Sequence, residues 1–171
     1  PRAVAEYHRT GAVGKPYQRD LLAWLRADVD PDAPLESVPQ LLATLMGRMT
    51  SPLDQQRTAA VAGYGSREAF GLRLQRLVNT HALLRCRHRL DDGRPVPRAQ
   101  AKLYLTDPLL AWLPSSLSPG LPRPTMTSLS EMALAVAMAR AVDGLEEGRW
   151  VAEDTIGYSR TSSGNEIDFS P

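Results

Sequence analysis

The sequence predicts an α+β protein in which a helical segment and a winged helix precede a smaller, incomplete α/β unit. Three observations support this class. Apolar residues recur at helical spacing up to residue 80, a capped helix leads into a basic hairpin, and the last residues alternate between apolar and acidic. A chain of 171 residues can bury a real core and suits one domain or two small ones.

Residues 1–50 are expected to form a helical connector. An apolar stripe over 17–29 indicates a helix that the prolines after Asp30 end, because proline lacks a donor and restrains the residue before it. Ser37 is the expected N-cap of a second helix that runs to about Met49.

Residues 51–113 predict a winged helix-turn-helix. A helix from about Leu53 to Ala62 precedes the turn at 63–66, where glycines permit positive φ and Ser66 can cap the next helix, over 67–80. A strand over 81–90, a turn over 91–95 and a return strand over 96–105 are then expected. A short helix over 109–113 should stop at Pro114.

Residues 114–128 are rich in proline and serine and are expected to form a loop or linker. The final unit, 129–171, should open with an apolar helix to about Val142, in which Glu131 is the only acid. Glu131 has two interpretations: a ligand that faces the interior, or a complement to the helix dipole in the first turn. Residues 150–151 and 155–158 are candidate short strands.

The last strand carries two carboxylates. Ile167 and Phe169 alternate with Glu166 and Asp168, so strand geometry should place the acids on the face opposite the apolar pair. An acid at this position can hold a metal over a phosphodiester, and the alternative is a solvated strand face. Because so apolar a strand should continue into a sheet, we expect this chain to be a piece of a longer protein.

The net charge of +1 conceals a basic block. Residues 67–102 carry nine Lys or Arg and three acids, which leaves +6 there and −5 elsewhere. Such a block is typical of a site for an anionic partner. We expect DNA phosphates to contact arginines of the second helix and of the hairpin: Arg67, Arg73, Arg76, Arg89, Arg94 and Arg98. The alternative is a winged helix that binds only protein.

Other residues restrict the cell compartment and the cofactors. The single Cys86 cannot form an internal disulfide, and no apolar run could span a bilayer, so we expect a cytoplasmic protein without a membrane partner. Gly14-Lys15 imitates a phosphate-binding loop, but Arg9 and Pro16 stand where that loop needs a glycine and a hydroxyl. We therefore expect no nucleotide site in these residues.

Three stretches together are similar to one family. Residues 101–110 (AKLYLTDPLL) are similar to K-x-Y-F-x-D-x-G-L, except at Pro108 and Leu109. Residues 129–132 (LSEM) lie where the family has Phe-Glu opening a helix, and residues 158–169 match Y-x-R-x-x-x-G-x-E-V-D-F. The chain thus resembles the C-terminal half of a large bacterial and archaeal family of predicted AAA-type ATPases. In that family a winged helix follows the ATPase module, and a restriction-endonuclease-like (PD-(D/E)xK) domain ends the chain.

The resemblance implies a DNA-engaging, regulatory region, with residues 129–171 as a partial endonuclease-like domain. Glu131 would match the helix acid of a nuclease-like site and Asp168 its first metal-binding aspartate, with a divalent metal as candidate ligand. The family's Glu-x-Lys strand and its ATP- and magnesium-binding module lie outside these residues. DNA, the protein's own upstream ATPase module and a second copy are the partners implied. The rival functions are a metal-dependent nuclease and a protein-interaction module that couples the ATPase to a partner.

Overall fold

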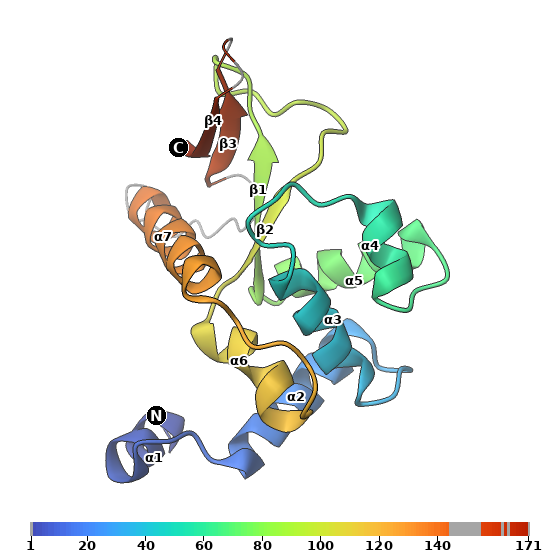
Figure 1. The fold of residues 1–171 in the computed structure, drawn as a ribbon, viewed down its shortest axis with the longest axis vertical. Coiled ribbons are helices and arrows are strands. Elements are labelled where there is room, and N and C mark those ends of the chain that lie inside the picture. The colour runs from blue at the N-terminus through green and yellow to red at the C-terminus, as the bar shows by residue number, and fades with distance from the viewer. Residues whose placement is uncertain (1, 144–154, 162, 164, 171) are drawn as a thin grey trace.

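The computed structural model describes residues 2–143, 155–161, 163 and 165–170, and this part of the chain is α+β (Figure 1). The described elements are, in chain order, α1 (Arg2–Thr10), α2 (Lys15–Val29), α3 (Ser37–Met46), α4 (Gln55–Val61), α5 (Arg67–Asn79), β1 (Leu83–His88), β2 (Lys102–Leu105), α6 (Pro108–Leu117), α7 (Met126–Asp143), β3 (Gly157–Arg160) and β4 (Glu166–Ser170). Of the two short strands expected near the C-terminus, 150–151 lies outside the described residues.

The strands form one sheet in the order β2-β1-β3-β4. β1 is antiparallel to β2 and parallel to β3, while β3 and β4 form an antiparallel hairpin. Figure 1 shows α7 and the α4–α5 pair on opposite sides of β1 and β2, with the β3–β4 hairpin beyond them at one end of the molecule. The sheet therefore joins the predicted winged-helix segment to the C-terminal segment.

Helices α4 and α5 and the turn between them form where the sequence predicts two helices and a turn. Asp54 caps α4 by accepting from the amide of Arg57 at 3.1 Å, and Ser66 caps α5 by accepting from the amide of Ala69 at 3.0 Å. Gly63, in the turn between them, has φ +81°, a conformation that glycine adopts without strain. The cap of α3 is different, because Glu36 occupies the N-cap position and Ser37 is the first helical residue.

Several element boundaries differ from the prediction. The strands expected over 81–90 and 96–105 are shorter, and residues 97–101 between them lie outside any strand. α6 continues past Pro114 to Leu117, so proline does not end it. Because α7 begins at Met126, the expected loop over 114–128 shortens to the residues between α6 and α7.

The buried core lies where α2, α3, α5 and α6 meet β1 and β2, and α7 adds apolar side chains to it. Phe70, Leu74, Leu77 and Val78 on α5 are all buried, as their helical spacing predicts. One cluster of buried residues extends from Leu22 to Ile156. Among the described residues, no helix has the length and apolar character needed to cross a bilayer.

Candidate nucleic-acid interface and buried lysine cluster

The two faces of β2 carry two different groups of side chains. Successive residues of a strand point to opposite faces. Leu103, together with Ala101 just before the strand, lines an arginine-rich groove, whereas Lys102 and Tyr104 face the carboxylates of α7 and β4. The two groups therefore lie on opposite faces of β2.

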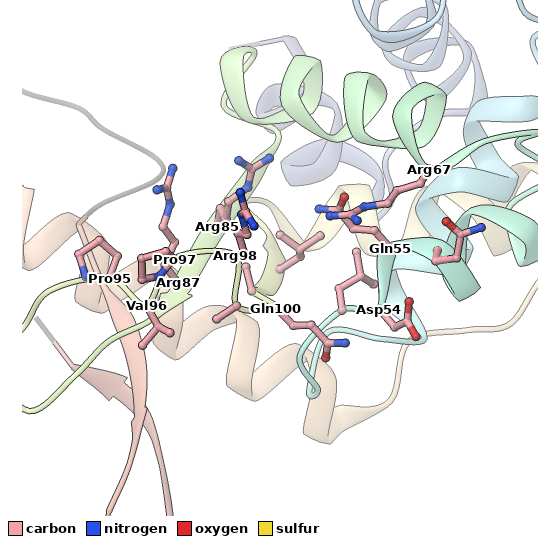
Figure 2. Close-up of a pocket in the computed structure, with 15 residues that line it drawn as sticks. Asp54, Gln55, Arg67, Arg85, Arg87, Pro95, Val96, Pro97, Arg98 and Gln100 are labelled. Atoms are coloured by element: carbon pink, nitrogen blue, oxygen red, sulfur yellow. The ribbon is translucent and has the colours of Figure 1, made fainter.

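The groove is a pocket of about 600 Å³ between the start of α4, the start of α5, β1 and residues 95–101. Figure 2 shows the lining residues that the structure describes, among which four are arginines and one, Asp54, is acidic. The Asp54 carboxylate already caps α4. The arginines come from three separate segments of the chain: Arg67, Arg85, Arg87 and Arg98.

Strand alternation explains two of these four arginines. Arg85 and Arg87 point to one face of β1, while Leu84 and Cys86 point to the other face and are buried. The Arg85 guanidinium donates to the Gln75 side chain of α5 at 3.1 Å, which holds it against the helix. Both arginines were part of the predicted basic block without being assigned to DNA contacts, although the period-two pattern of residues 83–88 could have indicated their shared face.

Arg73 and Arg76, both in the predicted DNA-contacting set, hold α5 against α2. The Arg73 guanidinium lies 2.7 Å from the carboxylate of Asp30, whose side chain is 4% exposed, and sits over the Tyr64 ring. The hydrogen bond to Asp30 raises the pKa of Arg73. Arg76 donates to the backbone oxygen of Val29 at 3.0 Å. These arginines therefore stabilise the helical packing.

Arg89 and Arg94, which were expected to contact DNA from the hairpin, are not among the described residues that line the groove. Arg94 pairs with Asp92 at 2.6 Å within the exposed turn. The Arg89 side chain lies against Gly157, where a Cβ would come within 2.6 Å of its Nε. Of the six arginines expected at phosphates, Arg67 and Arg98 line the groove.

On the other face of β2, Lys102 is buried between two carboxylates. Its side chain is 1% exposed, and its Nζ lies 2.6 Å from Glu166 and 2.7 Å from Asp168. Nζ also lies 5.5 Å from the centre of the Tyr158 ring. Burial alone would lower the pKa of Lys102, but the hydrogen bonds to Asp168 and Glu166 outweigh it and raise the pKa. The lysine is therefore charged at neutral pH.

Glu166 and Asp168, two residues apart on β4, both reach Lys102, and a β-bulge brings Phe169 to the same side. Gly157 pairs with Ser170 and Ser159 with Ile167, so one residue of β3 faces two residues of β4. Strict alternation is lost there: Asp168 reaches Lys102, and the Phe169 ring packs 5.6 Å from the Tyr104 ring. The prediction that Ile167 and Phe169 form one buried face is wrong, because Ile167 is 47% exposed.

Glu131 faces the same side of β2. The Tyr104 hydroxyl donates to its carboxylate at 2.6 Å, and burial together with this hydrogen bond raises the pKa of Tyr104. α7 begins at Met126, so Glu131 lies beyond the first turn and the dipole interpretation is wrong. Glu131 and Asp168 thus approach neighbouring side chains of one strand face.

This carboxylate cluster does not have the donor set of a metal site as it stands. Within the described residues, no group of three or more His, Cys, Asp or Glu side chains is arranged to hold an ion. Lys102 already pairs with Asp168 and Glu166, and Arg160 also pairs with Glu166. A divalent cation would have to displace the ammonium group, so the metal site remains a hypothesis.

Comparison of the chain with protein-family models, with curated proteins and with solved structures gives no match. The fold and the two groups of side chains on β2 are therefore the basis for assigning a function.

Proposed function

We propose that this chain binds nucleic acid, DNA in the first place, through the arginine-lined groove. It would act as the DNA-engaging and regulatory region that follows the ATPase module in the family that it resembles. One observation carries the proposal. Arginines from α5, from β1 and from residues 95–101 line a single groove, and among its described lining residues one carboxylate is present, which already caps a helix.

The chemistry of the groove suits phosphodiesters. Each guanidinium offers a planar set of donors that can bind phosphate oxygens in pairs. Arg85 and Arg87 are two residues apart on β1, so their Cα atoms are separated by roughly 6.6 Å and can serve neighbouring phosphates. Uncharged amides of Gln55, Gln56 and Gln100 complete the polar lining.

A winged-helix arrangement is part of this proposal. α4, the turn and α5 have the order of a helix-turn-helix, and the antiparallel β1–β2 pair follows as a wing would. Arg67 is the first residue of α5, and the first residues of a recognition helix are those that contact bases. Arg98 would reach DNA from the wing.

The test is fluorescence anisotropy with a labelled duplex at several salt concentrations. Reversing the charge of two groove arginines, R85E/R98E, should weaken binding more than ten-fold. It should also reduce the log–log salt slope by about 1.8, since each lost phosphate contact removes about 0.9. The matched control is R19E/R123E, which makes the same charge change at exposed residues outside the groove. Equal weakening by both variants would contradict the proposal.

The rival protein-interaction module predicts no salt-dependent DNA binding in the same titration. A metal-dependent nuclease is the other alternative, supported by the approach of Glu131 and Asp168 to one face of β2. Calorimetry with Mn²⁺ tests it: binding must occur and must be lost in both E131Q and D168N. A protein that takes up no Mn²⁺ would exclude a nuclease site in these residues.

A further inference from the structure

We infer that Tyr158 is a positioning residue for the groove, through which the β3–β4 hairpin holds the groove wall and sets its affinity for nucleic acid. The wall is defined as residues 95–101. This inference rests on the proposed function and adds the regulation of the same site by a segment about 60 residues further along the chain.

The wall depends on a few hydrogen bonds because most of it lies outside the sheet ladders. The amide of Val96 donates to the His88 carbonyl at 2.7 Å near one end. Near the other end, the amide of Leu53 donates to the Ala101 carbonyl at 2.8 Å, and the Tyr158 hydroxyl donates to the Gln100 carbonyl at 2.8 Å. The last of these bonds ties the wall to the C-terminal hairpin.

Tyr158 is well placed to fix the position of that carbonyl. Its side chain is buried, and its ring stacks on His88 with centroids 5.0 Å apart and planes at 20°. Its own backbone oxygen accepts from the amide of Arg89 at 2.8 Å. A rigid ring held at both ends transmits any displacement of β3 directly to Gln100.

The hairpin also holds the residue that follows the wall. Lys102 comes directly after Ala101 and pairs with Glu166 and Asp168 of β4. β3 therefore fixes the wall at Gln100, and β4 fixes the chain just after the wall, at Lys102.

Arg98 connects this attachment to the groove. It lines the groove and lies two residues before Gln100. Its φ is +61°, a backbone conformation that residues other than glycine rarely adopt. Such a backbone persists only where the surrounding structure holds it. Loss of the bond at Gln100 would let the wall relax and would move the Arg98 guanidinium away from Arg85.

The experiment compares Y158F with Y64F in the duplex titration. Y158F removes the hydroxyl and keeps the ring, and it should weaken binding roughly five-fold, the equivalent of one hydrogen bond. Y64F is the matched control, because it removes a hydroxyl that donates to the Asp30 carboxylate at 3.3 Å. Neither residue lines the groove. Y64F should change the affinity less than two-fold.

A double-mutant cycle separates positioning from general stability. If Tyr158 acts through Arg98, Y158F should change binding less than two-fold in an R98A background. A five-fold loss of duplex affinity when Y158F is added to R98A would overturn the inference. A duplex affinity of Y158F equal to that of the wild type would overturn it too. If Y158F does not fold, K102M tests the same attachment from β4, with the same expected loss and the same cycle.

The proposed function can fail separately. If R85E/R98E binds DNA as the wild type does, the groove is not the site and the inference fails with it. If R85E/R98E binds weakly while Y158F is unaffected, the proposed function stands and only the role of Tyr158 is refuted.

Discussion

Removing both acids that hold Lys102 should destabilise the protein more than removing the lysine itself. The ammonium side chain is 1% exposed, whereas Glu166 and Asp168 are 28% and 56% exposed. The variant E166Q/D168N leaves a buried cation without a counter-charge, which costs about 3–5 kcal/mol. In K102M the charges that remain are in contact with water, so the expected cost is about 1–2 kcal/mol.

Thermal and urea unfolding measure this difference. For a chain of this size, 1 kcal/mol shifts the melting temperature by about 2–4 °C. E166Q/D168N should therefore melt about 6–20 °C below the wild type, and K102M about 2–8 °C below it. R160Q, which removes the exposed partner of Glu166, is the control and should have little effect.

The pH dependence gives a second, independent check. In the wild type the pKa of Lys102 is raised, so its stabilising effect is present at neutral pH and is lost only as the pH rises above the usual lysine range. In E166Q/D168N the buried lysine should have a lowered pKa. The folded state of this variant then binds fewer protons than its unfolded chain, so its free energy of unfolding should rise with pH. The difference in stability from the wild type should therefore become smaller between about pH 8 and 10. An equal or larger cost for K102M would refute this account of the cluster.

Three further predictions concern other parts of the fold. R73E places a carboxylate against the buried Asp30 and should lower the free energy of unfolding by at least about 2 kcal/mol, measured by urea titration; an unchanged midpoint would mean that the pair is not structural. G157A should destabilise by about 1–3 kcal/mol, because a Cβ would lie 2.7 Å from a backbone oxygen of β1; a melting temperature equal to that of the wild type would contradict this. Burial raises the pKa of Cys86 from 9.0 to about 12, so the folded state keeps its proton longer and stability should fall as the pH rises through this range. C86A should make that fall shallower by up to about 1.4 kcal/mol per pH unit, and equal slopes for both proteins would exclude the effect.

Local chemistry was enough to predict α4, α5 and the turn between them. Ser66 can cap a helix whatever surrounds it, and the apolar spacing of α5 marks the face that becomes buried. The sequence also placed Arg67 and Arg98, which line the groove, in its basic block. It could not assign Arg73, because its role depends on the end of α2 more than 40 residues earlier in the chain.

The lysine cluster depends on contacts between distant segments. Lys102 looked like one more cation of the basic block, and its burial arises only when β4 pairs into the same sheet. The bulge opposite Tyr158 could not be predicted either, because a period-two pattern assumes that alternation is never interrupted. Pro114 illustrates a different limit, since a proline near the end of a helix removes one donor without preventing another turn.

The placement of the groove and the carboxylates on opposite faces of β2 has a thermodynamic consequence. Anything that binds the groove more tightly when the wall is fixed must, by linkage, stabilise the pairing of Lys102 with Glu166 and Asp168 by the same factor. Conversely, a change that separates those charges must lower the affinity of the groove for such a ligand by the same factor. The effect of a bound duplex on the opening of the β3–β4 hairpin, seen by hydrogen exchange, would therefore equal the effect of the hairpin on duplex affinity.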